Sequence, residues 1–326
     1  MTSDGLVDEF LAGLANTRLS PERAEVLRTL VSRLVDLVAL DPDDGDLKVA
    51  ATVMDELLEA ANVFSPWRAH AKFTVFGSAR TSPSSALYAM AAALGSAMAE
   101  RGWITVSGAG PGIMEAAARG AGREHTLGVN VELPFEQSAN PYVDAETRLV
   151  EMKYFFTRKV ALTKESIAFA VFPGGLGTMD ETFEILTLLH TGKSTPAPVA
   201  LVDTPEGTYW DEWLAFVEGS MVAAGYLDQV DTCLFRVCRS VEEVIAEVER
   251  FYSNYVGFEL DGPTARVALR RAITPGLLAS LAARVPNFAG GSGYRADENG
   301  LLAFDFDGRQ YVALRRVIDA VNDYSG

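Results

Sequence analysis

Short apolar runs alternate with longer amphipathic segments through most of the chain. The runs are rich in Val, Ile and Phe, which is typical of parallel strands buried on both faces. They cover residues 72–76, 103–107, 126–133, 167–172, 198–202 and 233–237. The segments between them repeat apolar residues at helical spacing, over residues 84–101, 113–120, 152–165, 179–189, 208–224 and 241–255. This alternation predicts an α/β fold with a doubly wound, Rossmann-like parallel sheet.

The two ends of the chain have a different pattern. Residues 1–68 are predicted to form a helical N-terminal extension, with two helices separated by a break at 41–45. Residues 69–256 hold the Rossmann-like domain. Residues 257–326 are predicted to form a small α+β extension, with a helix at 265–283, a glycine-rich turn near Gly290, a hairpin at 301–312 and a last helix. Packing, assembly and regulation remain open as roles for both extensions.

The most informative turn follows the expected strand 167–172. Pro173 ends the strand, and three glycines follow it: Gly174, Gly175 and Gly177. Thr178 has the position of a helix N-cap, and Glu181 completes a capping-box spacing. A strand, a glycine turn and a helix N-terminus present free N–H groups and a positive dipole end, which suit a phosphate. Such turns also occur for packing reasons alone, so this one indicates a ligand site without establishing it.

Two further glycine turns follow the first two expected strands. The first holds Gly77 and Ser78, and the second holds Gly108, Gly110 and Gly112. All three turns lie beyond the carboxyl ends of strands, where ligands of such sheets bind. The second turn has the spacing G-x-G-x-G, which differs from the dinucleotide fingerprint and does not favour a nicotinamide enzyme. The turn-rich segment 132–142 is equally consistent with a loop that closes over a ligand and with an ordinary surface loop.

The charge and residue composition of the chain limit the kinds of partner it can have. The formal net charge of -16 argues against nucleic acid, although a local cradle can still hold one small nucleotide. The two cysteines suggest a reducing compartment, and the three histidines show no metal-ligand spacing. No apolar run reaches membrane-spanning length, and the N-terminus lacks the regions of a signal peptide. We therefore expect a cytoplasmic protein with no membrane partner, no metal and no cofactor.

Three stretches together resemble the LOG (Lonely Guy) family over residues 70–250. They are P-G-G-L-G-T-M-D-E at 173–181, the pair Arg158-Lys159, and S-G-A-G-P-G-I-M-E at 107–115. Members were long labelled lysine decarboxylases, but no sequence context of a pyridoxal-binding lysine is visible here. The resemblance implies a Rossmann-like phosphoribohydrolase without a cofactor. Such an enzyme hydrolyses the N-glycosidic bond of a nucleoside 5′-monophosphate, of the AMP or cytokinin riboside type, to free base and ribose 5-phosphate.

The resemblance also implies roles for individual residues. Arg158 and Glu181 are the expected catalytic pair, and the chemistry agrees, because a carboxylate can stabilise an oxocarbenium-like state or activate water. We expect Glu181 to be ionised by the nearby helix N-terminus, and the permanently charged Arg158 to orient it and contact the substrate. The expected substrate-binding residues are Gly77, Ser78, Gly108, Gly110, Gly112, Lys159, Gly174, Gly175, Leu176, Gly177, Thr178, Asp180 and Thr187.

Two other functions remain open at this point. The first is a non-catalytic carrier that holds a nucleotide or a molybdenum cofactor without cleaving it. The second is a sensor whose two extensions respond to a bound nucleotide. The presence of both Arg158 and Glu181 favours the enzyme. The resemblance further implies a homodimer or an assembly of dimers, in which a neighbouring subunit completes each pocket.

Overall fold

A computed structural model describes residues 5, 13, 20–132, 139–286, 293–306 and 308–325. The chain divides into two compact units, Met1–Glu56 and Leu57–Gly326. The centre of the segment 132–142 and most of the glycine-rich turn expected near Gly290 lie outside the described residues.

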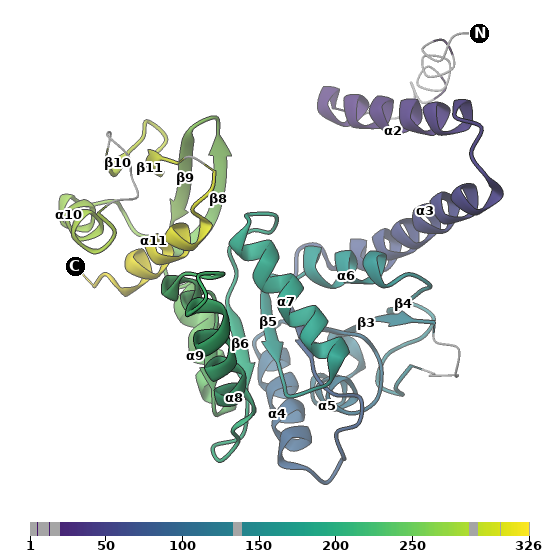
Figure 1. Cartoon of the computed structure of the whole chain (residues 1–326), viewed down its shortest axis with the longest axis horizontal. Helices are drawn as coiled ribbons and strands as arrows, with labels where there is room; N and C mark the ends of the chain where they lie inside the picture. The colour runs from purple at the N-terminus through teal and green to yellow at the C-terminus, as the bar shows by residue number, and fades with distance from the viewer. Residues whose placement is uncertain are drawn as a thin grey trace. The chain divides into compact units, whose positions relative to one another are not determined.

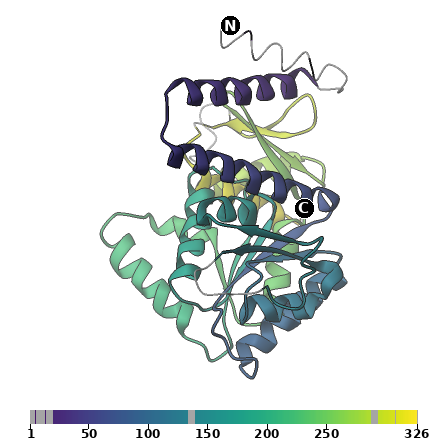
Figure 2. The ribbon, with the colours of Figure 1, turned by 90° about the vertical axis from the view of Figure 1, so that its right-hand side faces the viewer.

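The expected helical N-terminal extension and its break are confirmed. Helix α2 (Pro21–Ala39) begins at Ser20, whose side chain accepts a hydrogen bond from the Arg23 N–H. None of its residues is buried. A bend at Asp41, which has a positive φ of 50°, separates it from α3 (Asp44–Phe64). Figure 2 shows these two helices and the bend between them.

The second unit contains a parallel sheet of seven strands in the described part of the chain, which confirms the doubly wound α/β fold. The strand order is β4-β3-β2-β1-β5-β6-β7. The chain therefore moves outward from β1 to β4 and then returns to the other side of β1. The strands are β1 (Lys72–Phe76), β2 (Ile104–Ser107), β3 (Thr126–Val131), β4 (Leu149–Met152), β5 (Ala168–Val171), β6 (Val199–Val202) and β7 (Arg236–Cys238).

Helices cover both faces of this sheet, which is why the strands are continuous apolar runs. In β1, Phe73 and Val75 pack toward α4, α5 and α9, whereas Phe76 packs toward α6, α7 and α8. The first set of helices is α4 (Ala86–Glu100), α5 (Ile113–Ala121) and α9 (Val241–Phe251). The second set is α6 (Phe155–Lys164), α7 (Leu176–His190) and α8 (Tyr209–Phe216). Figure 1 shows the arrangement.

Short irregular elements complete this part of the chain. They are three 3-10 helices, η1 (Ser65–Trp67), η2 (Arg123–His125) and η4 (Gln229–Leu234), and one π-helix, η3 (Val217–Val222). Two expectations fail here. Residues 233–237 are not one strand, because η4 occupies the first two of them, and the expected helix 152–165 begins only at Phe155, after the edge strand β4.

The described C-terminal residues form a separate antiparallel sheet with two helices, as expected for an α+β extension. The strand order is β10-β11-β9-β8. The elements are β8 (Tyr255–Asp261), β9 (Thr264–Leu269), α10 (Pro275–Arg284), β10 (Arg295–Ala296), β11 (Leu302–Asp305) and α11 (Tyr311–Asp323).

The expected helix 265–283 and hairpin 301–312 are wrong. Ala265 and Val267 are buried at alternate positions of β9, so the first part of that segment has the period of a strand. The helix begins only at Pro275, after the N-cap Thr274. In the second segment, β11 pairs with β9 and β10, and the residues from Tyr311 onward belong to α11.

A buried carboxylate connects the C-terminal extension to the main sheet. Glu247 of α9 is 5% exposed. Its carboxylate forms an ion pair with Arg315 of α11 at 2.7 Å, and further ion pairs with Arg236 and Arg250. Arg250 also pairs with Asp319 of α11 at 2.8 Å. These ion pairs, together with an apolar cluster that includes Phe251 and α11, fix α11 against α9.

Candidate functional site

A cavity of about 590 Å³ opens at the carboxyl ends of β1, β2 and β5. This is the topological switch point, because the chain leaves β1 in one direction and resumes at β5 on its other side. The volume is in the range of small-molecule sites. The lining residues are Gly77, Ser78, Ala79, Arg80, Gly108, Gly110, Met114, Asn130, Val131, Phe155, Arg158, Gly175, Leu176, Gly177, Thr178 and Glu181. The three glycine turns recognised in the sequence therefore meet at one place.

The N-terminus of α7 forms one wall of this cavity. The expected N-cap at Thr178 is wrong, because α7 begins at Leu176 with Gly175 as its N-cap and no side-chain cap. Thr178 lies buried in the first turn, and its side chain leaves no room for a Cβ on Gly174, which would lie 2.1 Å from the Thr178 Oγ1. The first N–H groups of a helix have no intrahelical acceptor. An uncapped helix N-terminus that lines a cavity is suited to an anion.

The turns after β1 and β2 pack tightly against one another. A Cβ on Gly77 would lie 2.7 Å from the side chain of Ile113, and one on Gly112 would lie 2.3 Å from the Ser78 carbonyl oxygen. The Ile113 N–H donates to that same oxygen at 3.1 Å. Gly112 has a positive φ of 69° and packs against the turn after β1. It supports the shape of that turn but does not line the cavity.

Arg158 and Glu181 lie together in the cavity, from α6 and α7. The Arg158 Nη1 donates to the Glu181 Oε1 at 2.8 Å, and its Nε donates to the carbonyl oxygen of Val129 at 3.0 Å. Both side chains of the pair are almost fully buried, 10% and 12% exposed. The guanidinium is therefore held by β3 from one side and orients the carboxylate on the other. The Glu181 Oε2 accepts no hydrogen bond from any residue that the structure describes.

Burial raises the pKa of Glu181, while the Arg158 charge and hydrogen bond act in the opposite direction. The expectation that the helix N-terminus keeps Glu181 ionised left out this desolvation, which the sequence does not reveal. A carboxylate with a raised pKa takes up a proton more readily than an ordinary one. It is therefore a stronger base toward water or a substrate hydroxyl.

Lys159 and Asp180 are brought together, but outside the cavity lining. The Lys159 Nζ lies 2.8 Å from the Asp180 Oδ1 and 3.0 Å from the Glu184 Oε2. Burial lowers the pKa of Lys159, but its hydrogen bonds to the two carboxylates outweigh this and raise it. The pair connects α6 to α7 beside Arg158 and Glu181.

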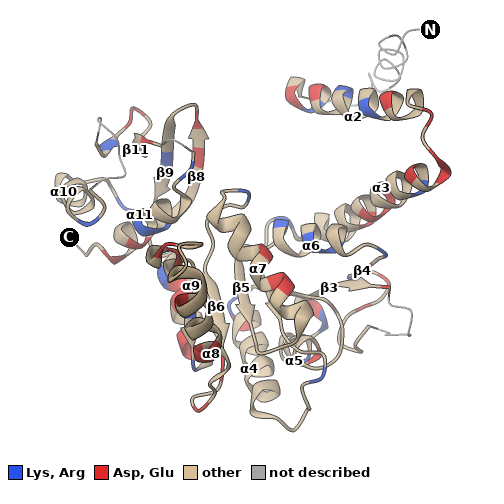
Figure 3. Ribbon diagram, viewed as in Figure 1, with Lys and Arg blue, Asp and Glu red and all other residues tan. Residues whose placement is uncertain are grey.

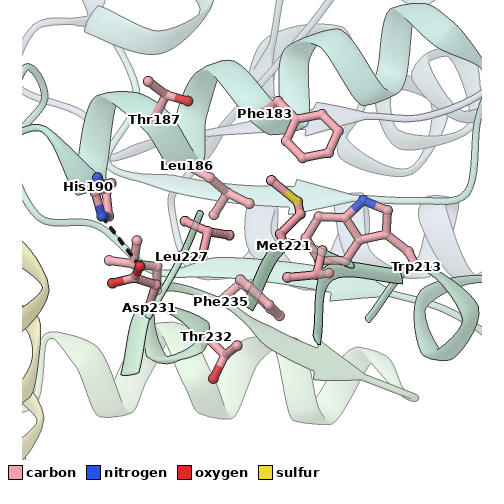
Figure 4. A pocket seen from close by; sticks show the side chains of 12 residues that line it. Phe183, Leu186, Thr187, His190, Trp213, Met221, Leu227, Asp231, Thr232 and Phe235 are labelled. Atoms are coloured by element: carbon pink, nitrogen blue, oxygen red, sulfur yellow. Dashed lines mark ion pairs between the residues drawn. The ribbon is translucent and has the colours of Figure 1, made fainter. Parts of the chain in front are cut away.

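Thr187 lines a second cavity of about 130 Å³. Figure 4 shows it with Phe183, Leu186 and Trp213 among mostly apolar neighbours, and with an ion pair of 3.5 Å between His190 and Asp231. Leu186 and Thr187 follow Glu181 by five and six residues on the same helix. Within one chain, Thr187 is thus separated from the cavity that holds Arg158 and Glu181.

Sequence reasoning missed six residues of the first cavity: Ala79, Arg80, Met114, Asn130, Val131 and Phe155. Of these residues, Arg80 could most readily have been identified from the sequence, since it belongs to the turn after the first strand and is basic in an acidic chain. Acidic residues occur on α3, α8 and α9, where the ribbon of Figure 3 is red. Arg80 forms no ion pair with any carboxylate that the structure describes, so its charge is available to an anion in the cavity.

No helix among the described residues is long and apolar enough to cross a membrane. Within the same residues, no three His, Cys, Asp or Glu side chains gather as they would around a metal ion.

Comparison with known proteins gives consistent matches. A family model described as "Possible lysine decarboxylase" matches residues 113–248. The cytokinin riboside 5'-monophosphate phosphoribohydrolase of Mycobacterium tuberculosis is 34% identical over 146 residues, which cover 43% of this chain and 74% of that protein. The enzyme LOG of Oryza sativa subsp. japonica is 29% identical over 168 residues, and the match covers 50% of this chain and 66% of that protein.

Solved structures resemble part of the fold. The molybdenum cofactor binding protein of Rippkaea orientalis is 20% identical with a TM-score of 0.40, covering 54% of this chain and 94% of that one. The molybdenum cofactor carrier protein of Chlamydomonas reinhardtii is 23% identical with a TM-score of 0.39, covering 56% and 97%. Likenesses of this size say nothing about activity.

Proposed function

Because this chain belongs to the LOG family of phosphoribohydrolases, we propose that it hydrolyses the N-glycosidic bond of a nucleoside 5′-monophosphate. The products are the free base and ribose 5-phosphate. The substrate is of the AMP or cytokinin riboside monophosphate type. The curated relatives are named for the second of these.

One observation carries the proposal. The Arg158–Glu181 pair and the uncapped N-terminus of α7 line the same cavity. The helix N-terminus provides N–H donors for the 5′-phosphate, and Arg80 adds a positive charge beside it. A nucleotide bound by its phosphate at this position has its ribose within the same cavity as Glu181. The cavity thus combines a phosphate subsite with a buried carboxylate.

The reaction follows from the two side chains. The bond between C1′ and the base breaks with its electron pair going to the base, while a water oxygen bonds to C1′. Glu181 stabilises the positive charge that develops at the ribose and takes a proton from the attacking water. Arg158 stays charged, so it cannot act as the acid that protonates the leaving base. Its role is to position the Glu181 carboxylate through the hydrogen bond to Oε1. The leaving base takes up a proton from solvent, and Glu181 afterwards releases to solvent the proton it took from water, so that the reaction consumes one water molecule.

Five residues implied by the family resemblance do not line this cavity in one chain: Gly112, Lys159, Gly174, Asp180 and Thr187. Gly112 and Gly174 belong to the tightly packed turns beside it. The other three need a different account. We assign Lys159 and Asp180 an indirect role, in which their ion pair fixes α6 against α7. For Thr187 we propose that it acts in the homodimer implied by the resemblance. Exposed apolar side chains of α6 and α7 support such an interface: Phe155, Phe156, Val160 and Leu176. Analytical ultracentrifugation of the purified chain tests the dimer, and a purely monomeric chain would contradict it.

The activity is tested by incubating the purified chain with a panel of nucleoside monophosphates and measuring free base and ribose 5-phosphate. Glu181→Gln should lose at least about 100-fold in turnover, the usual contribution of a general base. It should keep its affinity for AMP, because the phosphate subsite is unchanged. Glu242→Gln is the matched control, since Glu242 also lies on a helix, α9, but is exposed and outside the cavity. Full turnover by Glu181→Gln would refute the assignment.

The same panel of nucleotides distinguishes an active enzyme from a non-catalytic carrier. Tight binding of a nucleotide without release of base by the unmodified chain would favour a non-catalytic carrier. Absence of binding would leave an interaction or sensor role for the chain.

A further inference from the structure

Two successive carbonyl groups in the turn before α7 accept hydrogen bonds from different parts of the fold. The Ser78 N–H donates to the Pro173 carbonyl oxygen at 3.1 Å. The Tyr209 hydroxyl donates to the Gly174 carbonyl oxygen at 2.6 Å. Ser78 follows β1, whereas Tyr209 is the first residue of α8. The turn is thus fixed from the cavity side and from the α8 side.

The second of these bonds determines the direction of an N–H group. In a trans peptide the carbonyl and the following N–H point in opposite directions. The Gly175 N–H therefore points away from the Tyr209 hydroxyl. Gly175 lines the cavity, whereas Tyr209 does not. A hydrogen bond to the carbonyl also polarises the peptide and strengthens its N–H as a donor.

The start of α8 is itself held in place. Asp203, 3% exposed at the end of β6, accepts a hydrogen bond from the Tyr209 N–H at 3.1 Å. A Cβ on Gly207 would lie 2.1 Å from the Asp203 Oδ1, so the loop between β6 and α8 closes tightly over that carboxylate. The Trp210 Nε1 donates to the Val202 carbonyl oxygen at 3.0 Å. The Tyr209 hydroxyl is thereby presented to the turn from a fixed support.

We propose that Tyr209 is a positioning residue of the phosphate subsite. Its hydroxyl orients the Gly174–Gly175 peptide so that the Gly175 N–H faces the bound phosphate. This inference rests on the anion-binding part of the proposed function and does not depend on hydrolysis. Tyr209 lies 35 residues after Gly174, outside the glycine motif, and does not line the cavity.

The test is Tyr209→Phe in the full chain, with inorganic phosphate as the probe. The affinity is measured by titration, following the amide resonance of Gly175 in a two-dimensional NMR spectrum. In the unmodified chain we expect phosphate to shift this resonance. In Tyr209→Phe we expect phosphate affinity to fall about fivefold, as for the loss of one neutral hydrogen bond.

Tyr252→Phe is the matched control. The Tyr252 hydroxyl also donates to a loop carbonyl at 2.6 Å, that of Ile167, but at the amino end of β5. Both variants lose one hydroxyl and one hydrogen bond, so their unfolding free energies should change by similar amounts. Only Tyr209→Phe should weaken phosphate binding. An equal loss of affinity in both variants would indicate a purely structural role and overturn the inference.

Two further results would overturn it. One is unchanged phosphate affinity in Tyr209→Phe. The other is a Gly175 resonance in the unmodified chain that does not respond to phosphate. Hydrolysis is judged separately: if phosphate binds as expected but no nucleotide is cleaved, the proposed activity fails while the role of Tyr209 stands.

Discussion

The guanidinium of Arg158 lies directly against the Cα of Gly108. A Cβ added to Gly108 would come 2.1 Å from the Arg158 Nη2. The turn after β2 therefore sets the position of Arg158 from one side, while the Val129 carbonyl and Glu181 hold it from the other. The glycine at this position is needed for the Arg158–Glu181 geometry and not only for the shape of the turn.

We predict that Gly108→Ala displaces Arg158 and lowers turnover of AMP by about 100-fold, the cost of a misplacement of about 1 Å. Steady-state kinetics measure the effect. Gly219→Ala is the control, because nothing lies within 4 Å of a Cβ at Gly219. If Gly108→Ala retained full turnover, Arg158 would not need its observed position.

The pKa of Glu181 predicts the pH dependence of turnover. In the proposed mechanism the ionised carboxylate is the active form, so kcat should fall as pH decreases through this pKa. Burial raises the pKa, so the midpoint should lie above 4.5, the usual value for a glutamate. Arg158→Met removes the charge that opposes this shift, so any remaining activity should show its acid limb at higher pH. A limb that stays in place or moves to lower pH would contradict the pairing.

The same raised pKa predicts a change in stability with pH. Between the unfolded and folded pKa values, the folded chain holds a proton on Glu181 that the unfolded chain releases. The contribution of Glu181 to the free energy of unfolding is therefore present at low pH and lost as pH rises through the folded pKa. Glu181→Gln cannot titrate, so it should gain stability relative to the unmodified chain over this window. Urea unfolding across the pH range measures the difference, and a constant difference would show that the pKa is not raised.

Arg80 is predicted to contribute charge to phosphate binding. Arg80→Ala should weaken binding of AMP by about 10-fold, as expected for one charge-assisted hydrogen bond, and the loss should shrink at high salt. Isothermal titration calorimetry at two salt concentrations measures this. Arg101→Ala serves as the control, because Arg101 is exposed just before β2, at the opposite edge of the sheet. Equal affinities for Arg80→Ala and the unmodified chain would place the phosphate elsewhere.

Glu247 is predicted to be essential for the attachment of the C-terminal extension. Glu247→Ala leaves the buried Arg315 with Asp319 as its remaining carboxylate partner among the described residues, and should destabilise the chain by about 3 kcal/mol. Glu249→Ala, on the same helix, removes only an exposed pair with Arg101 and should cost less than about 1 kcal/mol. Chemical denaturation compares the two. Similar costs would show that the buried ion pairs do not matter for stability.

Most of the main sheet could be predicted from the sequence because its strands are buried on both faces, but the edge strand β4 was missed. Mostly apolar runs such as Lys72–Phe76, buried at every position, leave little ambiguity when glycine turns follow them. The structure of the C-terminal extension was harder to predict. Its strand Thr264–Leu269 contains two alanines, and its antiparallel pairing with β8 and β11 decides that it is a strand.

The site was predictable only in part. The glycine turns were recognised from their positions after the expected strands, and Arg158 and Glu181 from the family resemblance. The structure brings the three turns and this pair together at one cavity. The capping box at Thr178 failed because a glycine N-cap is also allowed, and no local signal separates the two starting positions of α7. The contacts of Gly108 with Arg158 and of Tyr209 with Gly174 depend on tertiary packing across distant segments. Sequence spacing carries no information about them.

The return of the chain from the outer edge strand β4 to the centre of the sheet at β5 affects folding as well as binding. The cavity walls come from segments before and after this return, so no contiguous fragment of either half can build the site. A nucleotide that binds there makes contact with both halves and stabilises only the state in which they are joined. Substrate should therefore protect the early and late strands against hydrogen exchange together, although the binding motifs lie in short stretches of the sequence.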